Sequence, residues 1–505
     1  MRKKRFLINA AITSTTSVFM NIVGVSFNVY ISNKLGAQGV GLFQLIMSVY
    51  GFSVTLASSG INLAATRLVA DELALNEKNA ASYIMKKCLT YAAFFGFLSF
   101  ILLFTFSDYI ALNLLCDERT KMSLKALSIS MVPIAMSSAM SGYFMGARKL
   151  SKSASAQIFE QFIKIGLSIL SLEIFIKKGI EYACLCVVLC GSISEIASFL
   201  YLYVLYLFDK RRHLSKNKRK NAYIEVIKIA VPVALSAYLR SALVTIEHLL
   251  IPRGLKKSGM DSETSLKCYG TIHGMTLPII LFPSSILKSL AGLLVPEFSE
   301  CLKLGHVRQI NHIASRMIKN ALLFSIFISG IFYCFADEFG RTIYKNSEVS
   351  YYIRLLAPLT VIMYVDGIVD GMLKGLNQQL NSMWYNIIDS FISVIAVIIL
   401  LPKYGASGYI AMIYISELLN GFLSINRLIK ITDFKVKYIS WIALPCVLVY
   451  SLGTIARIFL KMNTLLSIFS LTLTILFCLG GYLVFLVLFS VIDISPIKKA
   501  RHGFF

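Results

Sequence analysis

Charged residues are scarce in this chain of 505 residues, and acidic residues are the scarcer kind. Asp, Glu, Lys and Arg together make up 15% of the sequence, with 26 acidic residues against 50 basic ones, while 57% of the sequence is hydrophobic. A water-soluble protein of this length cannot carry so large an apolar share without exposing large apolar patches. The composition therefore excludes a soluble globular protein and predicts an integral membrane protein.

Motifs that mark common enzymes and metal sites are also missing from the sequence. None of the ten cysteines forms a CxxC pair, the six histidines are scattered, and no GxSxG, HExxH, P-loop or glycine-rich nucleotide motif occurs. Cysteines within apolar stretches are typical of small buried side chains. We therefore expect no catalytic residues, no metal and no cofactor. A membrane glycosyltransferase or polymerase stays as the enzyme alternative, but the longest external connection, about 252–268, contains only two acidic residues, Asp261 and Glu263.

A cleavage site for a signal peptide is missing as well. The basic start Met1–Arg5 is followed by an apolar stretch that reaches Tyr30 without a small-residue cleavage motif, which predicts a retained first helix. A helix needs about 20 mostly apolar residues to cross a bilayer. By this criterion the chain is an all-α integral membrane protein with about fourteen transmembrane helices, near 6–32, 40–66, 88–110, 124–147, 157–176, 182–208, 223–251, 270–295, 317–336, 351–373, 383–401, 405–429, 438–459 and 464–492.

Basic residues gather in the loops between these apolar stretches. If the N-terminus is cytoplasmic, the predicted inside loops carry 30 Lys and Arg and the predicted outside loops carry 16. Cytoplasmic loops of membrane proteins accumulate Lys and Arg, so this bias predicts a multi-pass plasma-membrane protein with both termini in the cytoplasm. The net charge of +24 does not indicate a nucleic-acid partner, because such a site needs basic residues grouped on one surface with stacking aromatics.

The two halves of the chain resemble each other. The segment from Gly142 to Phe162 aligns without a gap on the segment from Gly371 to Phe391, at an offset of 229 residues, and both begin with a GxxxG pair that allows close helix approach. Because the repeat covers an even number of helices, both copies keep one orientation, and a pseudo-twofold axis along the membrane normal is expected. We predict two six-helix lobes around a central cavity, at 1–208 and 223–430. A basic cytoplasmic linker at 209–222 joins them, and an added helix pair with a cytoplasmic tail follows at 431–505.

Short motifs in several predicted helices resemble those of a known transporter family. They are Gly36-Ala-Gln-Gly-Val-Gly-Leu-Phe-Gln44, Gly60-Ile-Asn-Leu-Ala-Ala-Thr-Arg67, Gly142-Tyr-Phe-Met-Gly146 and Ile229-Ala-Val-Pro232-Val-Ala-Leu-Ser236. With these motifs the chain resembles the polysaccharide and lipid-linked oligosaccharide flippases of the multidrug/oligosaccharidyl-lipid/polysaccharide (MOP) superfamily, and within it the stage V sporulation protein B family. The resemblance implies two six-helix lobes around a central cavity and an undecaprenyl-pyrophosphate-linked sugar, such as the peptidoglycan precursor lipid II, as the substrate. Members that flip lipid II carry an Arg and an Asp in the first helix, where this chain offers Asn21 and Asn28.

Basic residues inside predicted helices are the main candidates for binding such a substrate. An ionisable side chain near the bilayer centre costs about 2.5–3.5 kcal/mol on insertion scales, so it is expected to face the bundle interior. Arg240 lies in the middle of the seventh predicted helix with Glu247 two turns further on, and Lys288 lies in the eighth. A guanidinium binds phosphate oxygens bidentately. The alternatives are that Arg240 pairs with Glu247 or an acidic neighbour to hold helices together, and that Lys288 extends to an interface. Arg67, at the cytoplasmic end of the second helix, anchors that helix or meets an entering phosphate.

Carboxylates inside predicted helices form a second group. Glu195 and Glu417 occupy the same position of an Ile-Ser-Glu motif that recurs in the sixth and twelfth helices, and we expect both to be buried. Their duplication favours a role in stabilising each lobe over binding of a coupling ion. Asp366, Asp370 and Lys374 follow one another at four-residue spacing, which predicts a pair between Asp370 and Lys374, with ion coupling as the alternative.

These features together favour a flippase that exports a lipid-linked oligosaccharide by alternating access, for example a precursor of spore cortex peptidoglycan. Expected partners are the lipid-linked sugar pyrophosphate, membrane lipids and a cell-wall polymerase. A multidrug or cation antiporter of the same superfamily is the nearest alternative. Such an antiporter would need acidic cavity residues and few cavity cations, so Arg240 and the added helix pair argue against it.

Overall fold

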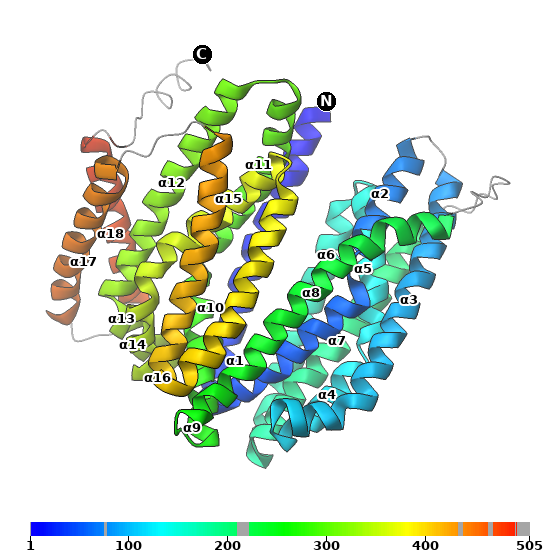
Figure 1. Ribbon diagram of the computed structural model, residues 1–505, viewed down its shortest axis with the longest axis horizontal. Helices are drawn as coiled ribbons and strands as arrows, with labels where there is room; N and C mark the ends of the chain where they lie inside the picture. Colours follow the sequence, from blue (N-terminus) through cyan, green and yellow to red (C-terminus); the bar gives the residue numbers. More distant parts are fainter. Residues whose placement is uncertain are drawn as a thin grey trace. The chain divides into compact units, whose positions relative to one another are not determined.

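A computed structural model describes residues 2–74, 78–209, 222–432, 438–462, 468–489 and 491, and this part of the chain is helical almost throughout, with no β-strand. The α-helices are α1 (Arg2–Ser58), α2 (Ile61–Ala74), α3 (Lys78–Tyr109), α4 (Lys121–Ser128), α5 (Met131–Gly146), α6 (Leu150–Phe175), α7 (Ile180–Asp209), α8 (Ala222–Lys257), α9 (Ser262–Tyr269), α10 (Leu277–Leu281), α11 (Ser284–Lys303), α12 (Val307–Cys334), α13 (Ala336–Phe339), α14 (Ser347–Leu356), α15 (Thr360–Gly375), α16 (Gln379–Ile431), α17 (Leu444–Met462) and α18 (Ile468–Leu488) (Figure 1). Short 3-10 or π segments join several of them: η1 (Ile110–Leu115), η2 (Glu118–Thr120), η3 (Ile176–Lys178), η4 (Gly270–Thr276), η5 (Gly340–Tyr344), η6 (Ala357–Leu359) and η7 (Ile439–Ala443).

Many of these helices are long and apolar enough to cross a membrane. Among the described residues there are nine such helices, or up to eleven if each of two bent pairs is one span, against the fourteen expected from the sequence. Part of the difference arises because α1 and α16 are 57 and 53 residues long and each contains one non-helical glycine, Gly36 (φ 69°) and Gly405 (φ 56°). A straight helix of that length would measure about 80 Å at 1.5 Å per residue, far more than the roughly 30 Å of a bilayer core. A positive φ costs glycine little, so the chain changes direction at these two residues.

The contacts divide the chain into two compact units. The first contains the described residues up to Gly270 together with 390–409, and the second contains Thr271 to Asp389 together with the described residues from Ile410 onward. In the first unit the core lies among α2, α3 and α5, with Ala65 and Phe144 fully buried. In the second unit it lies among α11, α12 and α15, with Phe298 and Met372 fully buried. The predicted lobe boundary stays a prediction, since 210–221 of the linker lie outside the described residues.

The sequence repeat reappears in the packing within each unit. A Cβ atom on Gly142 of α5 would lie 2.5 Å from the carbonyl oxygen of Asn62 in α2, and one on Gly371 of α15 would lie 2.9 Å from that of Ala291 in α11. No side chain fits at either position, so the GxxxG pairs bring the helix backbones together as predicted. Close approach then allows, in each unit, a hydroxyl group to donate a hydrogen bond to the carbonyl of one glycine of the pair. Thr66 donates to the Gly142 carbonyl at 3.2 Å, and Ser299 donates to the carbonyl of Gly375 at 3.1 Å.

The same offset of 229 residues relates local backbone features. The left-handed residues Cys116 (φ 53°) and Arg148 (φ 57°) correspond to Lys345 (φ 52°) and Asn377 (φ 59°). Each of Cys116 and Lys345 ends a π segment, η1 or η5, and the next residue begins a helix: the side chain of Asp117 accepts from the amide of Arg119, and Asn346 accepts from that of Glu348. The repeated fold therefore includes helix ends and turns as well as helices.

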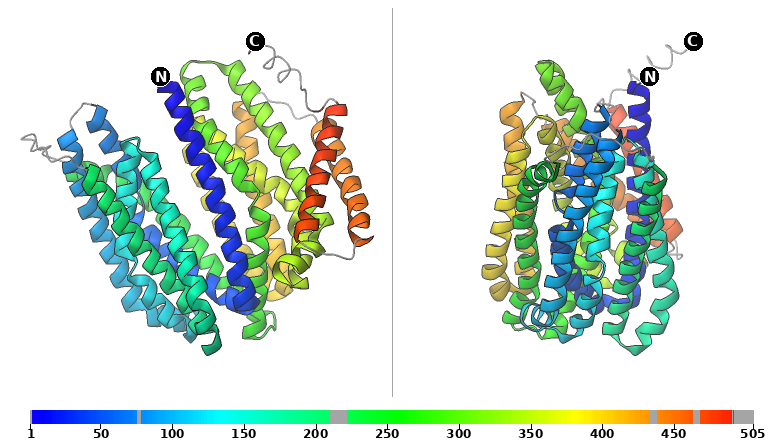
Figure 2. Two further views of the ribbon diagram at one scale, coloured as in Figure 1. Left: turned by 180° about the vertical axis from the view of Figure 1, so that it is seen from behind. Right: turned by 90° about the vertical axis from the view of Figure 1, so that its right-hand side faces the viewer.

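The helices α17 and α18 have no counterpart in the repeat, and they lie side by side in orange and red (Figures 1 and 2). Helix α17 packs tightly on α12 at two glycines. A Cβ on Gly330 would lie 2.0 Å from a methyl group of Val449, and one on Gly453 would lie 2.6 Å from the sulfur of Cys334. The added pair is thus joined to the second unit by closely fitted small residues and not by a loose apolar contact.

Candidate functional site

Helix α8 carries the strongest sequence candidate, and three contacts hold it along α1. A Cβ on Gly60, where α1 gives way to α2, would lie 2.2 Å from the carbonyl oxygen of Ala230. Further along, the hydroxyl of Tyr238 donates to the carbonyl of Leu56 at 3.1 Å, and the hydroxyl of Thr245 donates to that of Ser48 at 3.1 Å. Tyr238 and Thr245 are seven residues apart, so they lie on one face of α8, and this face is turned to α1.

Arg240 lies away from that face. It follows Tyr238 by two residues, which is about 200° around a helix, and its side chain is exposed. Within the described residues it makes no hydrogen bond or ion pair, so the predicted alternative of a pair with Glu247 is wrong. Glu247 is half-buried and has an interaction of its own.

Arg67 lies on α2, next to the tightly packed contact with α5. Its neighbour Thr66 and the nearby Asn62 both donate to carbonyls of α5, the latter to that of Ser138 at 3.0 Å. Arg67 itself is exposed and has no ion pair with any residue that the structure describes. Both basic candidates of the first unit therefore present a charge that has no counterion among the described residues.

Lys288 occupies a similar position in the second unit. Helix α11 packs on α15 through Ala291, Val295 and Phe298, and the aliphatic stem of Lys288 passes Gly367, where a Cβ would lie 4.0 Å from its Cγ. The side chain is exposed, and no ion pair joins its ammonium group to the described part of the chain. The two asparagines of the first helix differ in exposure: Asn21 is exposed and donates to the carbonyl of Ser17 at 2.9 Å, whereas Asn28 is half-buried and has a polar interaction.

Glu195 belongs to a polar cluster inside the first unit. It is half-buried, not buried as predicted, and the hydroxyl of Tyr50 on α1 donates to its Oε1 atom. Its Oε2 atom is buried and has no hydrogen-bond partner in the part of the chain that the structure describes. Beside it on α6, Glu160 is hydrogen-bonded to Ser198 of α7. Two carboxylates therefore share the space between α1, α6 and α7.

The second unit repeats part of this arrangement. Asp389, the repeat equivalent of Glu160, accepts a hydrogen bond from Ser416 at 2.6 Å. Glu417 is half-buried and has an interaction of its own. Glu160 and Asp389 occupy equivalent positions of the two aligned segments, 229 residues apart, and an acid at both positions was the signal in the sequence for a polar role.

Asp366 and Asp370 lie on α15. The amide of Asn420 donates to Asp366 at 3.2 Å, while the other carboxylate oxygen of Asp366 is buried without a partner. Asp370 accepts from Lys374 at 2.6 Å and from the hydroxyl of Ser382. The predicted pair between Asp370 and Lys374 is confirmed. Across the described residues, no group of three or more His, Cys, Asp or Glu is placed to hold a metal ion.

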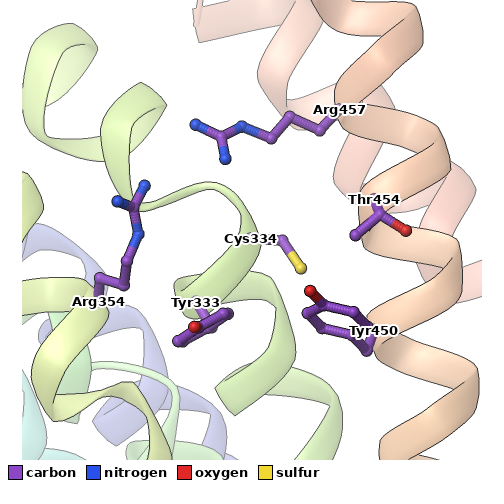
Figure 3. Close-up of a pocket in the computed structure, with 6 residues that line it drawn as sticks. All are labelled: Tyr333, Cys334, Arg354, Tyr450, Thr454 and Arg457. Atoms are coloured by element: carbon purple, nitrogen blue, oxygen red, sulfur yellow. The ribbon is translucent and has the colours of Figure 1, made fainter.

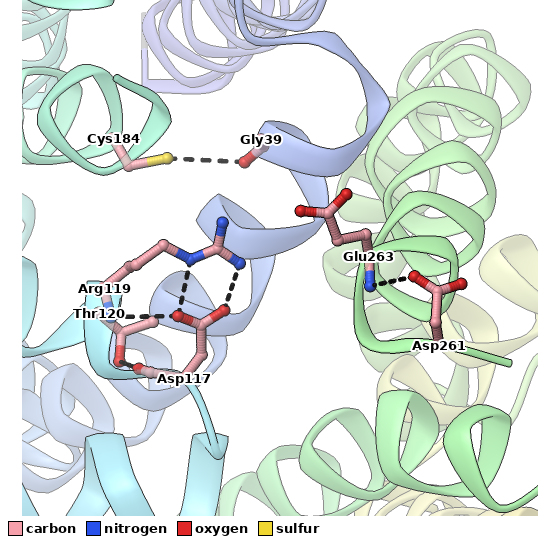
Figure 4. A network of polar contacts seen from close by, with 7 residues as sticks. All are labelled: Gly39, Asp117, Arg119, Thr120, Cys184, Asp261 and Glu263. Atoms are coloured by element: carbon pink, nitrogen blue, oxygen red, sulfur yellow. Dashed lines mark hydrogen bonds and ion pairs between the residues drawn. The ribbon is translucent and has the colours of Figure 1, made fainter. Parts of the chain in front are cut away.

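Helix α9 packs against α1 close to the break at Gly36, within the first unit. Figure 4 shows polar groups near this contact, and in the neighbouring segment η2 the carboxylate of Asp117 accepts from the guanidinium of Arg119 at 2.6 and 2.9 Å. Asp261 caps α9 by accepting from the amide of Glu263 at 3.2 Å. The pKa of the exposed Asp261 lies below its ordinary value, mainly because the side chain of Thr264 donates a hydrogen bond to its carboxylate. Backbone hydrogen bonds from Thr264 and Glu263 lower the pKa further.

A second ionic cluster, which sequence reasoning missed, joins α17 to the rest of the second unit. Arg354 of α14 donates to Asp337 at 2.7 Å, and Arg457 of α17 donates to the same carboxylate oxygen. Burial by itself would raise the pKa of Asp337, but the hydrogen bonds and charges of the two arginines outweigh it and lower the pKa. Arg457 is 120 residues from Asp337, outside the repeat, so no sequence pattern connected them.

Comparisons with known proteins assign this fold. The polysaccharide biosynthesis protein family matches residues 6–301. The chain is 26% identical over 445 residues to stage V sporulation protein B of Bacillus subtilis (strain 168), covering 86% of each protein. Its structure is similar to lipid II flippase MurJ in an inward closed conformation (TM-score 0.69, 13% identity, 95% of this chain and 98% of that chain). It is also similar to a multidrug resistance MATE family transporter of the MOP superfamily in an inward-facing conformation (TM-score 0.65, 13% identity, 84% of this chain and 100% of that chain).

The family match, the similarity to solved structures and the apolar helices all indicate a membrane protein. A likeness at 13% identity shows a shared fold, and here it is the fold of MurJ and of a MATE transporter. Together with the candidate spans, this makes the chain a multi-pass membrane protein. Since the family match covers more than half of the sequence, the protein is a member of the polysaccharide biosynthesis protein family.

Proposed function

We propose that this protein is a flippase that carries a lipid-linked oligosaccharide, such as an undecaprenyl-pyrophosphate-linked cell-wall precursor of the lipid II type, across the plasma membrane by alternating access. One observation supports it most. Arg67, Arg240 and Lys288 are exposed cations on apolar helices, without ion pairs to the described residues. A cation on a membrane helix needs water or an anion close by, and a pyrophosphate head group supplies the anion.

The proposed architecture has fourteen spans. The breaks at Gly36 and Gly405 divide α1 and α16 into two spans each, and α2 continues the second span of α1. Helix α6 adds one more span, which carries several charged residues. Two six-helix lobes then surround a central cavity, α17 and α18 form the added pair, and both termini are cytoplasmic. The terminal residues themselves, Met1 and 492–505, lie outside the described residues.

Each candidate has a proposed role. Arg240 binds the pyrophosphate in the cavity, Lys288 supplies a second cation, and Arg67 meets the head group where it enters. Asn21, Asn28 and Glu247 line the cavity and contact the sugar, since amides and carboxylates hydrogen-bond hydroxyl groups. A cell-wall polymerase that takes the exported precursor is the proposed partner.

The carboxylates are proposed to stabilise their lobes. Tyr50 donates to Glu195, Ser416 to Asp389 and Asn420 to Asp366, so these acids already have protein donors. Asp370 is held by Lys374 and Ser382, and Glu417 also has an interaction. Coupling-ion binding by Glu195, Glu417, Asp366 or Asp370 is the alternative, and sodium or proton dependence of transport would decide it.

The test is lipid flipping in proteoliposomes that contain the full chain and fluorescent lipid II. We expect Arg240→Gln to slow flipping at least tenfold and Arg240→Lys to restore part of the rate, because the charge remains while the bidentate geometry is lost. Lys257→Gln is the matched control. Lys257 is an exposed cation of the same helix without an ion pair to any described residue, and its loss should leave the rate unchanged.

Two results would count against this proposal. If Arg240→Gln flips the lipid at the wild-type rate, Arg240 is not part of the substrate site, but the proposed flippase function still stands. No flipping of any lipid-linked sugar by the wild-type protein, together with export of organic cations, would replace the flippase by a multidrug antiporter. The fold shared with a MATE transporter makes that antiporter the second candidate.

A further inference from the structure

The second unit contains a pocket at the place where the added helix α17 meets α12 and α14. Its volume is about 280 Å³, and it is lined by Tyr333, Cys334, Arg354, Tyr450, Thr454 and Arg457. Figure 3 shows the guanidinium groups of Arg354 and Arg457 pointing into one space, with the rings of Tyr333 and Tyr450 and the sulfur of Cys334 beside it. None of these residues belongs to the proposed substrate site.

The helices around the pocket are closely packed. Gly330 and Gly453 leave no room for a Cβ atom between α12 and α17, because the side chains of Val449 and Cys334 fill the space beside them. Arg354 and Arg457 are held by one carboxylate oxygen of Asp337, and the Nε atom of Arg457 lies 3.4 Å from Glu338. The pocket is therefore preformed, and ligand binding does not have to order these side chains.

Both arginines keep donors for a further acceptor. A guanidinium has five N–H groups, and the hydrogen bonds described above use one group of each arginine. The Nε atom of Arg457 is buried without a hydrogen bond, as is the Oε2 atom of Glu338. Two converging guanidinium groups with free N–H groups are suited to the tetrahedral oxygens of a phosphate.

The surroundings favour a lipid as the source of that phosphate. The pocket lies where α12 ends, and tyrosines such as Tyr333 and Tyr450 are typical of the boundary between lipid and water. Next to it, α17 exposes Val447, Ile455 and Ile458, which provide an apolar surface for acyl chains. The charges of the two arginines are balanced by Asp337 and Glu338, so a freely dissolved anion gains little, whereas a lipid adds the burial of its chains.

We propose that this pocket binds the phosphate of an anionic phospholipid, with the head group between Arg354 and Arg457 and the acyl chains along α17. A volume of about 280 Å³ lies at the small end of ligand pockets, so it suits a glycerol phosphate head group and not the sugar of a lipid-linked oligosaccharide. The site is independent of the proposed flippase function and of its substrate cavity. Its expected effect is to hold the added helices in place against the second unit.

Native mass spectrometry of the delipidated full chain tests the proposal by titration with phosphatidylglycerol, phosphatidylcholine or inorganic phosphate. We expect phosphatidylglycerol to bind at least tenfold more tightly than phosphatidylcholine, and inorganic phosphate not to bind at the same concentrations. Arg354→Gln should weaken phosphatidylglycerol binding about tenfold, because the arginine's N–H donors are lost. Lys303→Gln, which removes an exposed cation at the end of α11 in the same unit, should bind like the wild type.

Equal affinity for the two lipids would overturn the proposal without any variant. Unchanged phosphatidylglycerol binding by Arg354→Gln would overturn it as well, and binding of inorganic phosphate as tight as that of the lipid would assign the site to a free anion. If Arg354→Gln does not fold, Thr454→Met keeps all four charges and fills the pocket. That variant should lose phosphatidylglycerol binding at least fivefold, and wild-type binding by it would contradict the assignment.

Discussion

Gly41 of α1 and Gly270 at the end of α9 face each other in direct backbone contact. A Cβ on Gly41 would lie 2.1 Å from the carbonyl oxygen of Leu266 and 3.3 Å from the amide nitrogen of Gly270. A Cβ on Gly270 would lie 2.0 Å from the carbonyl oxygen of Ala37 and 2.6 Å from the nitrogen of Gly41. By the sequence repeat, α1 and α9 belong to different copies. The two glycines therefore let the backbones of α1 and α9 touch, and a side chain at either position would push them apart.

Replacement of either glycine should open this contact. We expect Gly41→Ala to lower the free energy of unfolding by about 1–3 kcal/mol, since backbone atoms cannot move aside as a flexible side chain would. The buried thiol of Cys184, which donates to the carbonyl of Gly39 at 3.6 Å, should react faster with a maleimide. Thermal unfolding in detergent and mass-spectrometric mapping of the modified cysteine measure the two effects.

The control for that variant is Gly51→Ala in the same helix. A Cβ on Gly51 would meet no atom within 4 Å, so alanine should leave stability unchanged or raise it by up to about 1 kcal/mol. An unchanged reactivity of Cys184 in Gly41→Ala would contradict this prediction, because it would show that the added methyl group does not expose the Cys184 thiol.

Equivalent glycines of the two repeats should respond alike. Gly142→Ala and Gly371→Ala each place a Cβ within 3 Å of the neighbouring helix, so each should cost about 1–3 kcal/mol. Gly166→Ala in α6 and Gly292→Ala in α11 meet nothing within 4 Å and serve as controls, one in each unit. Unfolding midpoints of the four variants provide the comparison. A large loss in only one of the two repeats would mean that the other can relax at its helix contact.

Asp337 should make the attachment of α17 depend on pH. Its pKa is lowered in the folded protein, so its contribution to stability is present above the unfolded pKa of about 3.9 and is lost as pH falls through the lower folded pKa. We expect Asp337→Asn to lower the unfolding midpoint at pH 7 and to differ less from the wild type near pH 3. Glu300→Gln, at an exposed carboxylate without an ion pair to described residues, should show no such change. A constant difference at both pH values would mean that the ion pairs do not contribute.

The hydroxyl of Tyr50 should matter because of its carboxylate partner. Tyr50→Phe removes the donor to Oε1 of Glu195, whose Oε2 atom already has none, so we expect a cost of about 1–3 kcal/mol. The same change should cost less in a Glu195→Gln background, since a neutral amide tolerates a missing donor better than a carboxylate. The four unfolding measurements form a double-mutant cycle. Additive effects would show that the two side chains do not interact.

The sequence by itself determined that the protein is helical and spans a membrane, because apolar stretches of sufficient length exclude other folds in lipid. It also determined the repeat, since the Gly142 and Gly371 motifs record a packing requirement that is local to each helix pair. The pair between Asp370 and Lys374 was predictable for the same reason: four residues on a helix bring two side chains together.

Only the tertiary structure decided the remaining relationships. Arg240 is exposed because Tyr238 and Thr245 fix which face of α8 meets α1, and periodicity alone cannot tell which face will pack. Arg457, Arg354 and Asp337 meet across three helices that no spacing connects, and Gly41 meets Gly270 although 228 residues separate them. Such contacts depend on how helices pack against one another, and a linear sequence records only the neighbours along each helix.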